Sequence, residues 1–282
     1  MKDYEKVKPS PYGKVVLITG ASSGIGKSTA LFLKDYGFHV FGVSRFADYS
    51  PSVSGYEGGF FKMLKMDVRD ENSVKNAVES IIKYEKNIDI LINCAGISVC
   101  GAVEHFSDNE MNDVINTNFY GYIRTIRAVL PYMREKNRGL IINIGSVAGI
   151  FALPYESIYS ASKASIESMT ESLRIELAKF NIKATVVAPG GVQTNFTDSR
   201  QFAYLAKYEN DYDEFMYDSV EKLGEEEQGG LEAEKVAKTI YALTQMENPP
   251  IRVVVGFKNK LLVFLKRLLP KSIVEAIIKF KF

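Results

Sequence analysis

Short apolar runs alternate with amphipathic stretches along most of this chain. Seven apolar runs are predicted to be strands: residues 14–19, 39–43, 61–66, 88–93, 139–144, 183–188 and 251–255. The first of them is rich in β-branched residues. Helical patterns fill gaps between them, as at residues 28–36 and 71–86. Strands that are apolar on both faces and separated by helices predict an α/β protein, a doubly wound parallel sheet of about seven strands with helices on both faces.

Neither an internal repeat nor a flexible linker divides the chain of 282 residues. We therefore expect one domain over residues 1–256, followed by an extension over residues 257–282. The extension is basic and amphipathic, with seven Lys or Arg side chains against the single acid Glu275. No apolar run is long enough to span a bilayer.

Composition excludes several classes of protein. The formal net charge of +1 gives no strong bias toward nucleic acid. The two histidines, His39 and His105, are far apart and lie at no metal-ligand spacing from a cysteine, so no metal site is predicted. The two cysteines, Cys94 and Cys100, are expected to be reduced, and the protein is expected to be cytoplasmic because its N-terminus lacks the apolar stretch of a signal peptide.

A glycine- and serine-rich turn, TGASSGIG at residues 19–26, joins the first predicted strand to a helix. Gly20 permits a sharp turn, Gly24 lets the backbone approach a pyrophosphate, and Gly26 lets the helix pack closely on the strand. The helix N-terminus offers N–H groups to phosphates. The turn predicts a dinucleotide site, although an ordinary strand-to-helix turn is the alternative. Its predicted ligands are Gly20, Ser22, Ser23, Gly24, Ile25 and Gly26.

The end of the second strand bears on which dinucleotide binds. NAD sites place an acid about 20 residues beyond the glycines, where it binds the ribose hydroxyls. Here the strand ends in Ser44 and Arg45, with no carboxylate at its tip. A small side chain beside a guanidinium suits a 2′-phosphate, so NADP(H) is predicted. The alternatives are that Arg45 is a solvated loop residue or that nearby Asp48 favours NAD.

Tyr159 and Lys163 lie four residues apart in a predicted helix and therefore share one face. A free tyrosine has a pKa near ~10, and a neighbouring ammonium would stabilise the phenolate and lower that pKa. Tyr159 could then exchange a proton with a carbonyl or an alcohol, while Lys163 also grips the nicotinamide ribose. A Tyr/Lys pair on a helix surface is the alternative interpretation.

These motifs together resemble the short-chain dehydrogenase/reductase family, whose signatures include TGxxxGxG and YxxxK. Four further segments follow the family's order: MDV at residues 66–68, NCAG at 93–96, NTNFYG at 116–121 and PGGVQT at 189–194. The resemblance spans residues 14–194 and the strand near residue 251. It departs from the family at Cys94, where a second Asn is usual, and carries Gly191 at a variable position. The implied fold is Rossmann-like.

The resemblance also implies the roles of individual residues. Ser146 would orient the substrate oxygen, and Asn118 would hold a water that links Lys163 to solvent. Asn116 is the competing asparagine, but it lacks a correctly spaced glycine. The catalytic set is therefore Asn118, Ser146, Tyr159 and Lys163. Further cofactor-binding residues are Asp67, Val68, Asn93, Ala95, Gly96, Tyr159, Lys163, Pro189, Gly190, Val192 and Thr194.

The segment over residues 195–230 is expected to be a substrate loop or lid. Its aromatic and Met side chains would form an apolar pocket wall or the core side of lid helices: Phe196, Phe202, Tyr204, Tyr208, Tyr212, Phe215, Met216 and Tyr217. Its acidic residues, such as Asp211, Asp213, Glu225, Glu226 and Glu227, are expected to form a solvated face. The chain looks like the branch that holds hydroxysteroid, retinol and acyl-dihydroxyacetone-phosphate reductases.

The predicted function is that of an NADP(H)-dependent oxidoreductase that interconverts a ketone and a secondary alcohol, with Tyr159 as general acid and base and an apolar, steroid-, retinoid- or lipid-like substrate. A non-catalytic NADP(H)-binding sensor or scaffold is the alternative. The family implies a homodimer or homotetramer. The tail over residues 260–282 is expected to pack over the pocket or at a subunit interface, with weak peripheral contact with a membrane as the alternative.

Overall fold

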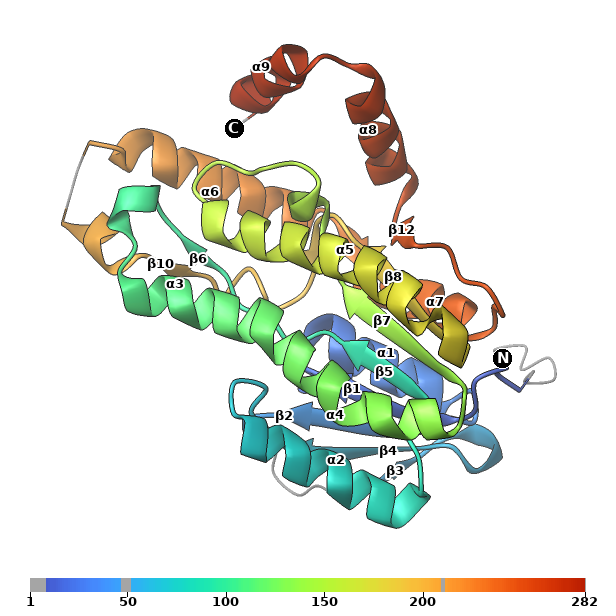
Figure 1. Ribbon diagram of the computed structural model, residues 1–282. Coiled ribbons are helices and arrows are strands. Elements are labelled where there is room, and N and C mark those ends of the chain that lie inside the picture. The colour runs from blue at the N-terminus through green and yellow to red at the C-terminus, as the bar shows by residue number, and fades with distance from the viewer. Residues whose placement is uncertain (1–8, 47–51, 209–210, 282) are drawn as a thin grey trace.

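The computed structural model describes residues 9–46, 52–208 and 211–281 (Figure 1). Its main sheet has eight strands in the order β12-β8-β7-β5-β1-β2-β4-β3. All neighbours pair in parallel except β3 and β4. The strands are β1 (Val15–Thr19), β2 (His39–Ser44), β3 (Val53–Ser54), β4 (Phe60–Lys65), β5 (Ile90–Asn93), β7 (Gly139–Ile144), β8 (Ile182–Ala188) and β12 (Arg252–Val254). The predicted α/β class is confirmed, and the short antiparallel β3 raises the strand count by one.

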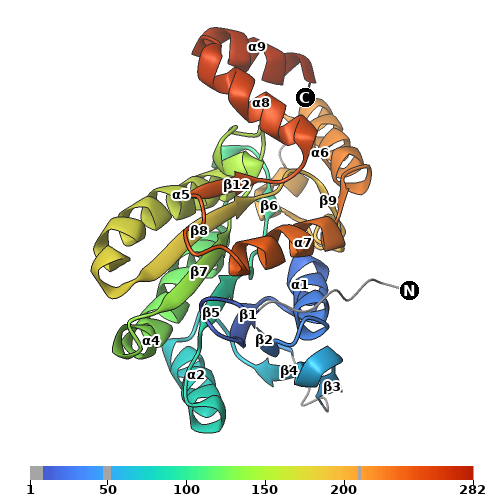
Figure 2. The same ribbon diagram turned by 90° about the vertical axis from the view of Figure 1, so that its right-hand side faces the viewer.

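Helices cover both faces of this sheet (Figures 1 and 2). Helices α1 (Gly24–Lys34) and α7 (Ala233–Thr244) lie together on one face, and α2 (Glu71–Glu85), α4 (Gly121–Glu135) and α5 (Ser157–Leu177) cover the other. Successive strand residues serve opposite faces: Val16 and Ile18 pack in the core with α1 and α7, whereas Val15 and Leu17 pack in the core with α2 and α4. Burial on both faces is why β1 is apolar at four consecutive positions.

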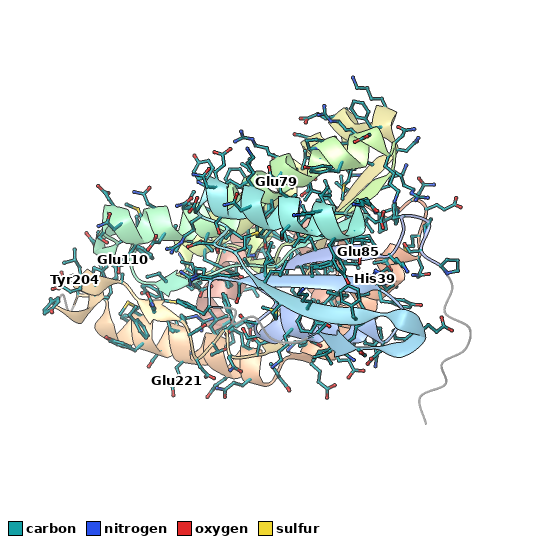
Figure 3. All side chains as sticks on the ribbon, turned by 90° about the horizontal axis from the view of Figure 1, so that it is seen from below. His39, Glu79, Glu85, Glu110, Tyr204 and Glu221 are labelled. Atoms are coloured by element: carbon teal, nitrogen blue, oxygen red, sulfur yellow. The ribbon has the colours of Figure 1, made fainter. Side chains whose placement is uncertain are left out.

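A smaller layer lies beyond the carboxyl ends of the strands. It contains β6 (Val99–Cys100) paired with β10 (Gln201–Phe202), β9 (Val192–Gln193) paired with β11 (Leu231–Glu232), and helices α3 (Asp108–Ile115) and α6 (Asp213–Gln228). Glu110 helps hold the layer together: it completes a capping box with Ser107, and it accepts the backbone N–H of Tyr204 at 2.8 Å (Figure 3).

The chain continues past β12 into helices α8 (Phe257–Leu268) and α9 (Lys271–Lys281), which project beyond the sheet layers (Figures 1 and 2). Val263 is the buried residue of α8, and α9 has none. Among the described residues, no helix is long and apolar enough to cross a membrane. Asp48, which bears on the choice of cofactor, lies outside the described residues.

Candidate active site

A cavity of about 650 Å³ opens at the carboxyl ends of the parallel strands. In the sheet, β1 has β2 on one side and β5 on the other, so the strand order reverses at β1. The connections that follow these strands therefore diverge and leave a crevice at their carboxyl ends. Residues from the ends of β1, β2, β5, β7 and β8 line the cavity, which extends to α6, α8 and α9. The sheet thus brings together motifs that lie up to 175 residues apart in the sequence, from Gly20 to Asn195.

The glycine turn forms one wall of the cavity, and its backbone conformation needs glycine. Gly20 and Gly24 have φ of 67° and 52°, a region that residues with a Cβ rarely adopt. A Cβ on Gly26 would meet the carbonyl oxygen of Gly20 at 2.3 Å. Thr19 Oγ1 accepts the backbone N–H groups of Cys94 and Ala95 at 2.9 and 3.0 Å, which locks the turn to the end of β5. No side chain caps α1 at Ser23 in this described segment, so its first N–H groups can face a phosphate.

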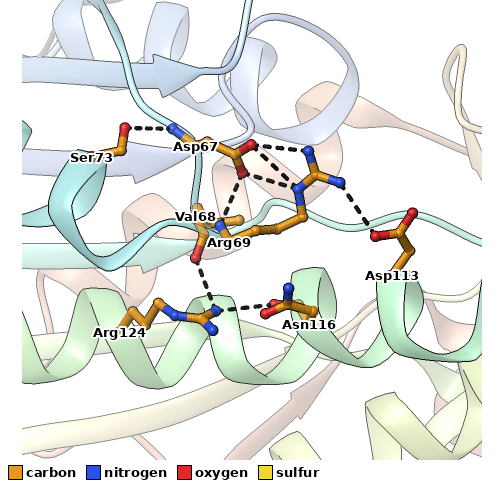
Figure 4. A network of polar contacts seen from close by, with 7 residues as sticks. All are labelled: Asp67, Val68, Arg69, Ser73, Asp113, Asn116 and Arg124. Atoms are coloured by element: carbon orange, nitrogen blue, oxygen red, sulfur yellow. Dashed lines mark hydrogen bonds and ion pairs between the residues drawn. The ribbon is translucent and has the colours of Figure 1, made fainter. Parts of the chain in front are cut away.

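Two arginines lie at the far end of the cavity, beside the tip of β2. Arg69 binds Asp67, with Nη2 3.0 Å from Oδ2, and reaches Asp113 at 3.4 Å (Figure 4). Burial alone would raise the pKa of Asp67, but the hydrogen bonds and charge of Arg69, together with the charge of Arg45, leave that pKa below its usual value. Ser44 Oγ is buried without a hydrogen-bond partner among the described residues. This end of the cavity is therefore positive and has an unused hydroxyl, which fits an anionic ribose phosphate.

Arg69 was not among the residues predicted from sequence. It follows the Asp67-Val68 pair directly, at the same carboxyl edge of the sheet as Arg45, and both arginines line the cavity. A basic residue two positions after a strand-ending acid was the available signal.

Ser146, Tyr159 and Lys163 meet near the middle of the cavity. Ser146 follows β7, and Tyr159 and Lys163 lie in the first two turns of α5. Lys163 is buried, and its Nζ donates to the carbonyl oxygen of Ile144 at 2.9 Å and lies 5.6 Å from the ring centre of Tyr159. The Tyr159 hydroxyl bonds the Ser146 side chain. A hydroxyl, a phenol and an ammonium are thus held at one place.

Burial shifts the pKa values of Lys163 and Tyr159. It lowers the pKa of Lys163 to about 8. Burial also raises the pKa of Tyr159, and the negative charge of Glu156 raises it further. The hydrogen bond with Ser146 acts in the opposite direction and lowers that pKa. Lys163 is not among the groups that shift the Tyr159 pKa, so the expected lowering is not seen, and the ammonium donates to Ile144 O. Tyr159 is therefore held protonated, the form that a proton donor needs.

Asn118 lies behind the trio in a turn of π-helix over Asn116–Tyr120, between α3 and α4. Such turns insert an extra residue and occur often at functional sites. Asn118 Oδ1 accepts from Ile97 N at 2.9 Å, and Nδ2 donates to Ile97 O at 2.9 Å and Ser162 Oγ at 3.0 Å. It is fully buried and lies outside the cavity lining. In this geometry Asn118 positions the loop after β5 and the start of α5.

Asn116, the competing asparagine, accepts at its backbone carbonyl from Arg124, away from the trio (Figure 4). Asn93 also lies behind the cavity. It bonds Asn143 Oδ1 at 3.0 Å and Thr125 Oγ1 at 2.6 Å, which ties β5 to β7 and α4. The side chain of Asn93 thus serves the sheet, whereas its neighbours Cys94, Ala95 and Gly96 line the cavity.

The other predicted residues are brought together. The cavity lining includes Gly20, Ser22, Ser23, Gly24, Ile25, Gly26, Ser44, Arg45, Asp67, Val68, Ala95, Gly96, Ser146, Tyr159, Lys163, Pro189, Gly190, Val192 and Thr194. The histidines take no part: His39 pairs with Glu85 at 2.8 Å at the other end of the sheet (Figure 3), and His105 is buried. No cluster of His, Cys, Asp or Glu suited to a metal ion occurs in the part of the chain that the structure describes.

A buried ion-pair network lies in the wall of the cavity, to which Glu156 and Glu227 contribute. Arg200 lies between two carboxylates, 3.0 Å from Glu156 and 2.6 Å from Glu227. The side chains of Arg200 and Glu156 are only 4% and 2% exposed. Thr197 also donates to Glu227, at 2.5 Å. The expectation that Glu227 belongs to a solvated face was wrong: it anchors the loop after β9 to the protein.

The walls around Tyr159 are apolar, but few of the predicted aromatic side chains form them. Phe196 does, with its ring centre 5.8 Å from that of Tyr159. Met216 instead packs in a separate small core with Phe106 and Val114, which favours the lid-core interpretation. Four other tyrosines and one phenylalanine of the segment are exposed: Tyr204, Tyr208, Tyr212, Tyr217 and Phe215. Further apolar side chains of the lining are Phe151, Leu153, Leu223, Leu262, Ile277 and Ile278, while Phe46 lies beside Arg45.

The chain is similar to known oxidoreductases. The short chain dehydrogenase family matches residues 14–203. A 3-ketodihydrosphingosine reductase from Bacteroides thetaiotaomicron is 41% identical over 243 residues, which cover 86% of this chain and 88% of that protein.

Solved structures share the fold. A short-chain dehydrogenase/reductase from Burkholderia phymatum in complex with NAD superposes with a TM-score of 0.74 at 22% identity, over 90% of this chain and 93% of that one. ElxO with NADP bound gives a TM-score of 0.67 at 30% identity, over 86% of this chain and 96% of that one.

Proposed function

Because the chain belongs to the short-chain dehydrogenase/reductase family, an oxidoreductase family that binds NAD or NADP, we propose that it reduces an apolar, lipid-like ketone to a secondary alcohol with NADPH. One observation carries the proposal: Ser146, Tyr159 and Lys163 lie together in the wall of a cavity that is also lined by the glycine turn and by apolar side chains.

The reaction needs a proton at the substrate oxygen. Ser146 is placed to donate a hydrogen bond to that oxygen and orient it, and Tyr159, kept protonated by burial, is placed to deliver the proton. Lys163, which donates to Ile144 O and lines the same cavity, would bind the nicotinamide ribose, as the family implies. The dinucleotide, cradled by Gly20, Gly24 and the start of α1, would supply the hydride.

The substrate class rests on the cavity walls and on one relative. Phe151, Leu153, Phe196 and Leu223 line the same cavity as Tyr159, and the Phe196 ring lies 5.8 Å from that of Tyr159, so a ketone bound there would be held by apolar contacts. The relative from Bacteroides thetaiotaomicron is named for the reduction of a long-chain ketone. We therefore favour a ketone that carries an alkyl chain over the steroid and retinoid classes.

The first experiment measures NADPH and NADH oxidation by purified protein against acyl-chain, steroid, retinoid and small aliphatic ketones. Turnover with an acyl-chain ketone is expected, and Tyr159→Phe should reduce kcat at least about 100-fold because the proton donor is lost. Tyr120→Phe, at an exposed tyrosine outside the cavity, is the matched control and should retain activity. Cofactor binding without turnover on any ketone would favour a non-catalytic NADP(H) sensor instead.

The preference for NADP(H) is proposed from Arg45, Arg69 and the unpartnered Ser44 hydroxyl. Replacing Arg45 with Ala should weaken NADPH binding by about 10- to 100-fold, the loss of one charge-assisted phosphate contact, and leave NADH binding nearly unchanged. Arg127→Ala, at an exposed arginine on α4, is the control. Equal loss for the two cofactors in a titration of bound nucleotide fluorescence would contradict the role given to Arg45.

We propose further that the enzyme is a homodimer or homotetramer that pairs through α4 and α5, as the family implies, and that it acts in the cytoplasm. Light scattering of the purified full chain tests the first point, and a monomer at micromolar concentration would contradict it.

A further inference from the structure

The two C-terminal helices expose two apolar stripes. On α8, Phe257, Leu261, Phe264 and Leu268 follow one another at intervals of four, three and four residues, so they share one face. Their exposed fractions are 83%, 47%, 57% and 65%. A helix that packs only on its own protein would turn such a stripe inward.

Helix α9 repeats this arrangement. Ile273, Ile277 and Phe280 lie four and three residues apart and are 46%, 50% and 93% exposed. We call these three residues and the four on α8 the tail stripes. Seven large apolar side chains gathered on two adjacent helices mark an interaction surface rather than scattered surface residues.

Positive charges flank the stripe on α8. At 100° per residue, Lys258 lies on one side of the stripe and Lys260 and Arg267 on the other, and all three are exposed. Lys266, on the opposite side of the helix, donates instead to the carbonyl oxygen of Ile150 in the body of the protein. The stripe is thereby turned away from the body, with cations along both of its edges.

This pattern fits one kind of partner. We propose that α8 and α9 dock on the surface of an anionic lipid bilayer, with the tail stripes in the acyl boundary and Lys258, Lys260 and Arg267 at the phosphates. A second copy of the chain suits the surface less well, because a symmetric contact would place the same cations against each other. The helices are too short to span a bilayer, so the contact is peripheral.

The docked surface adjoins the cavity that holds Tyr159. Leu262 of α8 and Ile277, Ile278 and Lys281 of α9 line that cavity, and Lys281 pairs with Glu226 of α6 at 2.5 Å. Docking would therefore place the apolar end of the cavity beside the lipid phase, where a ketone with an alkyl chain resides. This step rests on the proposed function, whereas docking itself does not.

Vesicle co-sedimentation of the full chain tests the proposal without any need for turnover. The protein should pellet with vesicles of phosphatidylglycerol and phosphatidylcholine, and much less with phosphatidylcholine alone. Replacing Lys258, Lys260 and Arg267 with Gln should weaken binding about 100-fold, at roughly fivefold for each cation removed. Phe264→Ser with Leu268→Ser should weaken it by a similar factor, since neither residue lines the cavity and both are exposed.

Val103→Ser with Met246→Ser is the matched control, because these side chains are 63% and 42% exposed and lie outside the tail and outside α4 and α5. It should pellet like the wild type. Equal pelleting of all variants, or no pelleting of the wild type, would overturn the proposal. The proposal would also be overturned if the protein did not bind vesicles and light scattering showed an oligomer that Phe264→Ser with Leu268→Ser dissociates. An enzyme active on soluble ketones that ignores vesicles refutes only the docking, while a vesicle-binding protein without turnover refutes only the proposed function.

Discussion

At the scale of single residues, the site depends on holding Lys163 inside the protein. Its ammonium is nearly inaccessible to water and is compensated by one carbonyl, that of Ile144, and by the faces of Tyr122 and Tyr159 at 5.7 and 5.6 Å. No carboxylate contributes to its lowered pKa. A buried cation without an anionic partner costs stability, which is a common feature of catalytic groups.

The pKa of Lys163 gives a prediction about stability. The folded value is about 8 and the unfolded value is 10.5, so the unfolded chain binds more protons between these pH values. The free energy of unfolding should therefore gain up to about 3 kcal/mol from this residue as pH rises through that window. Lys163→Met should remove the gain and be the more stable protein at pH 7. Urea unfolding of both proteins at pH 7 and pH 10 measures the difference.

Lys75→Met, at a lysine that is 69% exposed on α2, serves as the control and should shift stability equally at both pH values. A difference between the wild type and Lys163→Met that does not change with pH would show that the ammonium is not desolvated in solution.

At the scale of elements, a buried network joins three segments that meet at the substrate side. Glu156 precedes α5, Arg200 lies in the loop before β10, and Glu227 ends α6. Burial raises the pKa of Glu156 despite the charge of Arg200 and the bonds from Ser98 and Cys100. Arg200 therefore compensates two carboxylates, and it fixes the loop over the cavity relative to the helix that carries Tyr159.

Removing Arg200 should leave two buried carboxylates uncompensated. We expect Arg200→Met to lower the free energy of unfolding at pH 7 by about 3–5 kcal/mol. Arg127→Met breaks an exposed pair with Glu71 at 3.3 Å and should cost less than about 1 kcal/mol. Adding Glu156→Gln and Glu227→Gln to Arg200→Met should restore most of the loss. Denaturant unfolding of the wild type, the two single variants and the triple variant measures these differences. A loss of less than about 1 kcal/mol in the free energy of unfolding for Arg200→Met would mean that water reaches the network.

At the scale of the whole molecule, the doubly wound sheet supplies a rigid platform, and the segments that close the cavity come from elsewhere in the chain. Helices α6, α8 and α9 all contribute to the lining, through residues between Leu223 and Lys281. Ser146, Tyr159 and Lys163 rest on the interior strand β7 and on α5, whereas α8 has one buried residue and α9 has none. The residues proposed for proton transfer and those proposed for substrate contact thus lie in parts that we expect to differ in local stability.

Deleting α9 should impair contact with an alkyl-chain substrate without impairing the proposed proton transfer. Because the helix has no buried residue, truncation after Leu268 should change the free energy of unfolding by less than about 1 kcal/mol. It removes Ile277, Ile278 and Lys281 from the cavity wall, so KM for an alkyl-chain ketone should rise several-fold while kcat for a small ketone stays the same. Steady-state kinetics with both substrates test this, and equal changes for the two would contradict a role in substrate contact.

The amino-acid pattern alone determined the α/β class and the seven parallel strands, and most of the site residues predicted from it line the cavity. The reason is that these features are local: a strand buried on both faces needs an apolar run, a turn at positive φ needs glycines such as Gly20 and Gly24, and Tyr159 and Lys163 share a helix face by spacing. The order of strands then brings these local motifs to one edge of the sheet.

Tertiary structure decided what depends on contacts between distant segments. Asn93 and Asn118 follow family motifs, yet their side chains point into networks with Asn143, Thr125, Ile97 and Ser162, which no spacing rule reveals. The burial of Glu227 depends on Arg200, 27 residues earlier in the chain. The direction of the tail stripes depends on where the helices meet the body. An amphipathic pattern shows that a helix has an apolar face, but only the packed chain shows whether its own core covers that face.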